Sequence, residues 1–183
     1  MRLPLLLLTA TALTLAGCGS DEVSLTNASP EEVAKEVAKS GGRAGFNPGQ
    51  WETTVETIDI DIPGLPAQLK DQMTELMKKT QTASSCITPE EANSPPAEIL
   101  AASEGRCRYE TFKMGGGKMD GTLKCSGEGM MGEMTMKISG TFDDDSFVID
   151  NDVDATAPNG GPAMKIKSRS TGKRTGECTA TKA

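Results

Sequence analysis

The feature that most constrains this chain is the stretch CRYETFKMGGGKMDGTLKC, which runs from Cys107 to Cys125. Three consecutive glycines at 115–117 predict a turn between two strands, because glycine adopts the backbone conformations that tight turns require. Folding the stretch about Gly116 places Cys107 directly opposite Cys125, where a disulfide can form across the hairpin. The stretch therefore predicts two antiparallel strands joined by a covalent cross-link.

Composition extends this prediction to the rest of the chain. The 183 residues suggest one domain, and 20 glycines and 10 prolines favour short strands and many turns over a helical bundle. Aromatic residues make up only 3% and the net charge is −7, so the chain lacks the basic surface and stacking side chains that bind nucleic acid. The absence of histidine excludes the usual Ser-His and Cys-His catalytic systems and the common His-based zinc sites.

The N-terminus predicts export and lipidation. Residues 1–17 carry Arg2 and then an apolar run that is too short for a membrane-spanning helix of about 20 residues and typical of a signal peptide. The run ends in Leu-Ala-Gly-Cys, which resembles the lipobox of bacterial lipoproteins and implies cleavage before a lipidated Cys18. We therefore expect a periplasmic protein anchored by lipid to a membrane. The outer membrane is favoured over the inner, because Asp does not follow Cys18.

We predict three regions: a signal peptide with lipobox at 1–17, a lipidated tether with a short linker helix at 18–45, and a disulfide-bonded antiparallel β domain at 46–183. Within the tether, Ser-Pro-Glu-Glu at 29–32 has the residues of a capping box with proline at the first helical position. The pair Gly41-Gly42 is expected to end this helix.

A second helix is predicted over residues 66–80, inside the β domain. Its apolar residues recur at helical spacing and lysines occupy the opposite side. The apolar residues are Leu65, Leu69, Met73, Leu76 and Met77. We expect this helix to pack across the open face of the sheet; the alternative is an amphipathic membrane or lid helix.

Two further stretches predict strands and their faces. Residues 133–142 alternate between polar and apolar, which is typical of a strand with one buried face. Asn159-Gly160 is the preferred pair for a two-residue type I′ turn, and a hairpin centred there has a single consistent register. Its expected pairs are Asp154–Lys165, Asp152–Lys167 and Asp150–Arg169 on one face, and Val153–Ile166 and Ala155–Met164 on the other. Because a slip of one residue would reverse the faces, these charges specify register.

Four cysteines remain after Cys18, and disulfides are expected in an exported chain. The hairpin selects the pair Cys107–Cys125, which leaves Cys86–Cys178 to join an early strand to the last one. The absence of a Cys-x-x-Cys motif argues against a redox enzyme.

The methionines offer one candidate metal site. Met134 and Met136 share a strand face, Met130 and Met131 are near in sequence, and thioethers suit Cu(I). The competing interpretation is that methionine fills a core poor in aromatic residues, which the alternation at 133–142 favours. We find no catalytic pattern and predict no cofactor.

Several short motifs, in this order, resemble the bacterial exported proteins of domain of unknown function family 3617. They are NPGQWE at 47–52, IPGLP at 62–66, SCITPEEA at 85–92, the hairpin at 107–125 and SRSTGKRTGEC at 168–178. The resemblance implies an exported, disulfide-bearing β domain with no established activity, and it supplies no site residues.

The sequence thus predicts a mainly β fold: an antiparallel meander, curved or partly closed, with one packed amphipathic helix and two disulfides. We expect a membrane-anchored periplasmic lipoprotein that serves as a non-enzymatic binding or envelope-structural module. Its expected partner, besides the membrane, is a small apolar ligand between sheet and helix, or an envelope protein. The alternatives are an enzyme that acts on envelope components through Asp and Glu, and a methionine-based Cu(I)-binding protein.

Overall fold

The computed structural model of this chain describes residues 22–40, 46–78, 80–92, 105–126, 132–156 and 163–178. The predicted signal peptide and Cys18 lie outside the described residues. So do the Asn159-Gly160 turn and the methionine pair Met130-Met131.

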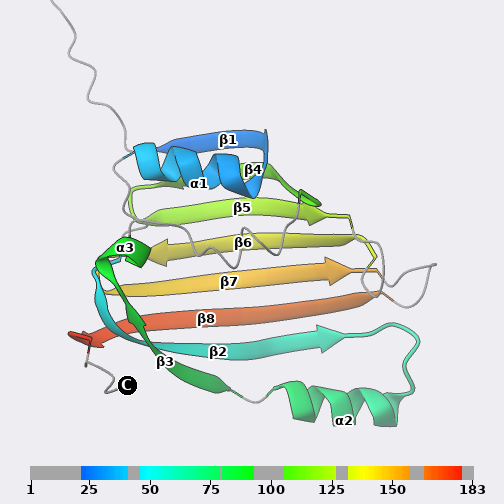
Figure 1. Cartoon of the computed structure of the whole chain (residues 1–183). Helices are drawn as coiled ribbons and strands as arrows, with labels where there is room; N and C mark the ends of the chain where they lie inside the picture. The colour runs from blue at the N-terminus through cyan, green and yellow to red at the C-terminus, as the bar shows by residue number, and fades with distance from the viewer. Residues whose placement is uncertain are drawn as a thin grey trace, which may run out of the picture.

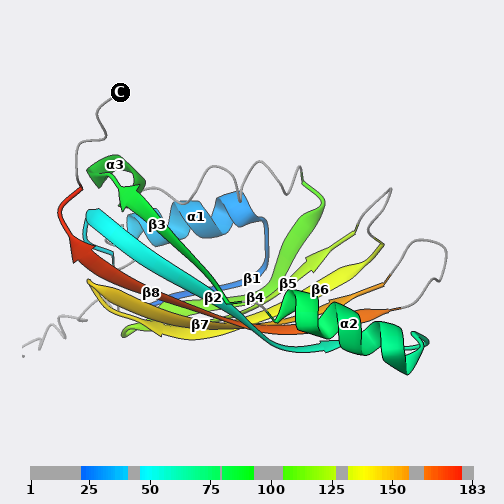
Figure 2. The same ribbon diagram turned by 90° about the horizontal axis from the view of Figure 1, so that it is seen from below.

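Eight antiparallel strands form one unclosed sheet in the order β1-β4-β5-β6-β7-β8-β2-β3 (Figure 1). The strands are β1 (Val23–Ala28), β2 (Gly49–Asp61), β3 (Gln81–Ile87), β4 (Cys107–Gly115), β5 (Lys118–Cys125), β6 (Met134–Phe142), β7 (Ser146–Ala155) and β8 (Met164–Gly176). The described helices are α1 (Pro30–Lys39), α2 (Ala67–Met77) and α3 (Pro89–Ala92). Figure 2 shows that the sheet is curved and that α1 lies on its concave side. The prediction of a mainly β, antiparallel fold is confirmed.

The region predicted as a tether and linker helix contributes to the sheet, which corrects the expected boundary at residue 45. β1 pairs with β4 at the sheet edge, and α1 packs on the sheet through Val33, which is 6% exposed. The predicted capping box is present: Ser29 Oγ accepts from the Glu32 backbone N–H at 3.2 Å, and Glu32 accepts from the Ser29 N–H at 2.7 Å. β1 forms because apolar Val23 and Leu25 alternate with polar residues, so one side of this short strand can be buried.

The helix predicted at 66–80 exists as α2, but the expectation that it packs across the sheet is wrong. Leu69 and Leu76, on its apolar stripe, are 47% and 67% exposed. β2 continues to Asp61 before the chain turns, so α2 begins beyond the end of the strand, beside β2 (Figure 1). Lys70 pairs with Asp61 at 2.5 Å at this junction. The helix that covers the sheet is α1.

The hairpin of β4 and β5 has the predicted cysteine pair and a different turn. Gly116 and Gly117 have φ of +58° and +71°, the positive values that a two-residue type I′ turn requires at both central positions. With this turn alone, Cys107 would miss Cys125 by one residue. A register shift between Tyr109 and Thr111 restores the pairing. This β-bulge compensates for a turn that is one residue shorter than the predicted three-glycine turn.

The predicted register of β7 and β8 is confirmed at every expected pair. The ion pairs form at 2.7 Å for Arg169 and Asp150, 3.2 Å for Lys165 and Asp154, and 3.7 Å for Lys167 and Asp152. The alternation predicted for β6 is also present, with its methionine, isoleucine and phenylalanine side chains half-buried.

Candidate functional site

The pairing registers divide the strand residues between a convex and a concave face, because directly paired residues point to the same side of a sheet. The concave face is the one on which α1 packs against β1 and β4. Among the described strand residues on this face, Arg174 alone is charged. The concave face is therefore the candidate site.

One end of this face is closed by an aromatic cluster. Trp51 is 1% exposed, and its ring lies 5.2 Å from that of Phe46 and 6.1 Å from that of Phe147. Trp51 Nε1 donates to the backbone oxygen of Asn47 at 3.0 Å. A Cβ on Gly172 would lie 2.0 Å from Phe147, so glycine is needed there for the ring to fit. Trp51 is therefore the anchor of this end of the core.

A second cluster lies under α1. Val23, Ala28 and Phe112 are each at most 7% exposed and pack with Val33 of the helix. Tyr109 stacks edge-on against Phe112 with ring centroids 5.3 Å apart, and burial raises the pKa of its hydroxyl. α1 thus supplies a second layer for β1, β4 and part of β5.

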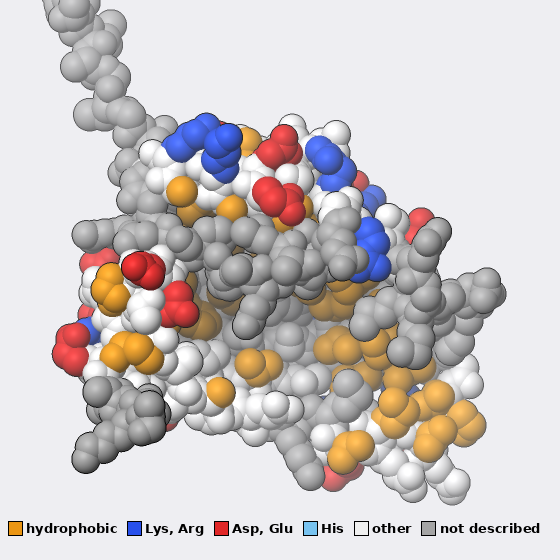
Figure 3. Space-filling model, viewed as in Figure 1, with side chains coloured by type: hydrophobic (Ala, Val, Ile, Leu, Met, Phe, Trp, Pro, Cys, Tyr) orange, Lys and Arg blue, Asp and Glu red, His pale blue; other side chains and the backbone are white. Residues whose placement is uncertain are grey.

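The remainder of the concave face holds what we name the apolar row, one residue from each of five neighbouring strands. Its members are Leu123, Met136, Val153, Ile166 and Ile60, each directly paired with the next. The first four are half-buried and Ile60 is 3% exposed. Four strand spacings make the row roughly 19 Å long. Figure 3 shows apolar side chains gathered in the hollow between α1 and α2.

An uncharged polar patch adjoins the apolar row on β7, β8 and β2. Asn151 pairs with Ser168, two residues along their strands from Val153 and Ile166, and Ser168 pairs in turn with Thr57. On β5 and β6 the same positions are Gly121 and Ile138. The concave surface therefore changes from wholly apolar to mixed along the direction from β5 to β2.

The convex face is charged throughout its centre. Basic residues of β8 stand between acidic residues of β7 and acidic residues of β2. Arg169 donates to both carboxylate oxygens of Asp150, at 2.7 and 3.0 Å, which lowers the pKa of Asp150 and raises that of Arg169. This ladder explains the acidic stretch of β7 by register. Among the described residues, no group of three or more Cys, Asp or Glu side chains is placed to hold a metal.

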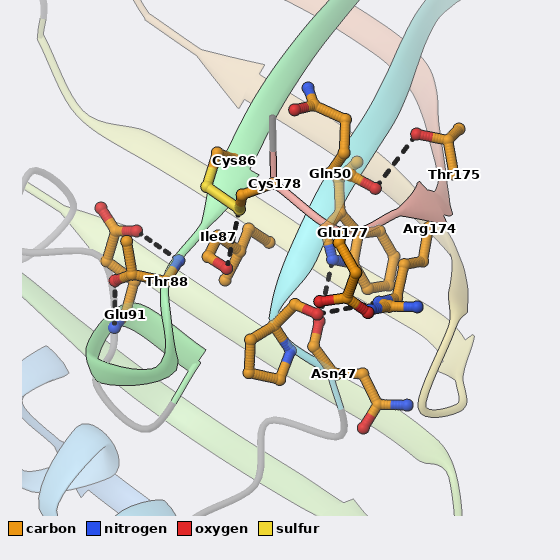
Figure 4. Close-up of a disulfide and its surroundings, with 12 residues drawn as sticks. Asn47, Gln50, Cys86, Ile87, Thr88, Glu91, Arg174, Thr175, Glu177 and Cys178 are labelled. Carbon is orange, nitrogen blue, oxygen red and sulfur yellow. Dashed lines mark hydrogen bonds and ion pairs between the residues drawn. A yellow bond between two sulfur atoms is a disulfide. The ribbon is translucent and has the colours of Figure 1, made fainter. Parts of the chain in front are cut away.

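Both predicted disulfides are present. Cys107–Cys125 closes the β4–β5 hairpin, and Cys86–Cys178 joins residues 92 apart, with its Cα atoms 5.4 Å apart. Figure 4 shows the second disulfide beside Arg174, which donates to the backbone oxygen of Pro48 at 2.8 Å and pairs with Glu177. Arg174 is thus committed to this corner of the sheet.

A capped turn follows β3 at the same corner. Glu91 accepts from the Thr88 backbone N–H at 2.8 Å, which lowers the pKa of Glu91, and the Glu91 N–H donates to Thr88 Oγ1 at 3.2 Å (Figure 4). The contacts of this corner are those of a structural junction.

The structure describes two of the four candidate copper ligands. Met134 and Met136 lie on the concave face of β6, beside Ala155 and Val153, while the other two methionines fall outside the described residues. The Cu(I) hypothesis therefore stays a prediction. The apolar row was not predicted, because it exists only when the registers of five strands are combined.

The fold and the concave face together define a single-sheet β protein with one charged and one apolar surface. The family model described as Protein of unknown function (DUF3617) matches residues 46–178, and the chain belongs to this family. Comparisons with curated proteins and with solved structures gave no match. None of the helices among the described residues is long and apolar enough to cross a bilayer.

Proposed function

We propose that this protein is a lipid-anchored binding module of the cell envelope and that it holds an apolar ligand on the concave face of its sheet. The observation that carries the proposal is the apolar row, four of whose five members are only half-buried, on a face with a single charged strand residue among those described. A sheet with one apolar face needs a second layer to bury that face. α1 supplies this layer over β1, β4 and part of β5, which leaves the remaining strands for a ligand.

The proposed location rests on the sequence of the N-terminus. The lipobox-like end of residues 1–17 supports lipidation of Cys18, and attachment of two or more acyl chains gives stable anchoring. Val23, the first residue of β1, comes five positions after Cys18, so the chain between them spans at most about 18 Å. The lipid would therefore hold the β1 edge close to the membrane. We favour the outer membrane because Gly19, and not Asp, follows Cys18.

Native purification from membranes, followed by mass spectrometry of the protein and its companions, tests both parts. We expect a mature chain that begins at a lipidated Cys18 and carries an apolar ligand. A mature protein with intact, unmodified Cys18 would refute the anchor. The binding role is wrong if nothing co-purifies and an apolar fluorescent dye also fails to bind.

The enzymatic alternative has less support from the carboxylates. The pKa values of Glu91, Asp143 and Asp150 are lowered, and hydrogen bonds or an ion pair account for each shift. A general acid at neutral pH needs the opposite shift.

A further inference from the structure

We infer that the ligand is a membrane-derived amphiphile with an acyl chain and an uncharged ester or amide head. Its chain lies across the strands along the apolar row, and its head lies against the polar patch of Asn151 and Ser168. This inference rests on the proposed function and specifies the ligand class of the same face.

The length of the apolar row fits one acyl chain. Half of the ~30 Å hydrocarbon core of a bilayer, or roughly 15 Å, is the span of one chain in its leaflet. The row of roughly 19 Å accommodates this span across β5 to β2. The direction of the row also leads from Leu123, next to Tyr109 and the cluster under α1, to Ile60 at the end of β2. A linear apolar molecule matches this shape.

The polar patch defines the head. Asn151 offers an amide and Ser168 a hydroxyl, which donate to and accept from ester or amide groups. The one charged strand residue on the described part of this face, Arg174, lies six residues from Ser168 along β8, about 20 Å away, and is already bound to Pro48 and Glu177. A carboxylate or phosphate placed on the patch would be desolvated without a counterion. An uncharged head avoids this cost.

The membrane is the expected source. Since the proposed lipid anchor leaves at most about 18 Å between Cys18 and β1, the concave face stays within reach of membrane lipids. A protein partner and a second copy of this chain enter the test as contrary outcomes.

The test titrates the full-length protein, in detergent-free nanodiscs, with monoacylglycerols of increasing chain length and with the corresponding fatty acids at pH 8. Methyl-13C methionine NMR reports the position. We expect Met136 and Met164 to shift and Met73 on α2 to stay unchanged. Each added CH2 should raise the affinity about fourfold until the row is filled. The fatty acid should bind about tenfold more weakly than the neutral ester.

Matched variants separate the face from the fold. Val153→Asp on the concave face of β7 should abolish binding, and Val148→Asp on the convex face of the same strand should leave it unchanged. If Val153→Asp fails to fold, Ser168→Lys replaces it: a cation at the patch should reverse the preference in favour of the fatty acid. Thr171→Lys, on the convex face of β8, is its control and should not do so.

The outcomes distinguish the ligand class from the function. Equal or tighter binding of the fatty acid by the unaltered protein refutes the uncharged head. Absence of acyl-chain binding while an apolar dye still binds refutes the acyl chain and keeps the proposed function. Absence of binding by every apolar probe refutes both. A co-purified protein, or a dimer, whose contact is lost with Val153→Asp and kept with Val148→Asp would replace the lipid as occupant.

Discussion

On β8, the convex face carries Lys165, Lys167 and Arg169, while the concave face of the same strand carries Ile166 and residues with hydroxyl groups. Each convex residue is paired with a carboxylate of β7, so a slip by one residue would break the ion pairs and expose the apolar side chains. The charged face thus specifies register. The apolar face does not have to specify the register, so it can remain partly uncovered.

The largest difference between the faces should appear on removal of a large side chain. Trp51→Ala on the concave face should lower the free energy of unfolding by about 3–5 kcal/mol, because the ring is almost fully buried in the aromatic cluster. Val148→Ala, at a 39% exposed side chain on the convex face of β7, should change it by less than about 0.5 kcal/mol. Urea unfolding measures both. Equal effects would contradict the assignment of the core to the concave face.

The next effect concerns the covalent link between β4 and β5. Replacement of both Cys107 and Cys125 by serine should lower the free energy of unfolding by about 3 kcal/mol, the loop-closure estimate for residues 18 apart. The measurement is thermal or urea unfolding, and a non-reducing peptide map confirms that Cys86–Cys178 stays intact. A map of the unaltered protein that shows Cys86–Cys107 would refute the pairing.

A smaller effect is expected on the convex face. Asp152→Lys and Lys167→Asp should each reduce stability, and the double swap should recover about 0.2–1 kcal/mol through the restored exposed pair. The recovery should decrease at high salt, because exposed charges are screened. A double variant no more stable than the single variants would show that this pair does not help to fix the register.

The smallest expected effect is the change of stability with pH. The pKa values of Asp143 and Asp150 are lowered in the folded protein, so their stabilising effect is present above the unfolded pKa near 4 and is lost as pH falls through the lowered values. The urea midpoint should be constant from pH 8 to about 5 and decrease below about 4. Asp150→Asn should weaken this decrease. Binding on the concave face should not change between pH 5 and 8, and a change there would contradict the uncharged ligand.

The sequence predicts the strands and the β7–β8 register because alternation and charge are local patterns. Val153 and Ile166, for example, are placed by neighbouring residues of their own hairpin. β1 was missed because it is six residues long and its Asn27 has a positive φ of 51°, which interrupts the alternation. The apolar stripe of α2 shows which side is apolar and contains no information about what that side contacts. Cross-strand features such as the apolar row depend on all the registers at once.

The β-bulge next to Tyr109 has a consequence for oxidative folding. In the register set by the two-glycine turn, Cys125 would face Arg108 and Cys107 would face Ser126, so neither cysteine would have a partner. Because Glu110 bulges out and is left without a partner on β5, the two cysteines come into alignment. If Glu110 instead entered the ladder, neither thiol would face a partner, and under oxidising conditions both would be open to wrong pairing with Cys86 or with another chain. Deletion of Glu110 would remove the bulge and keep Cys107 opposite Cys125 in a regular ladder. Whether Glu110 bulges or enters the ladder thus decides whether this hairpin matures with its cross-link or becomes a source of misfolded protein.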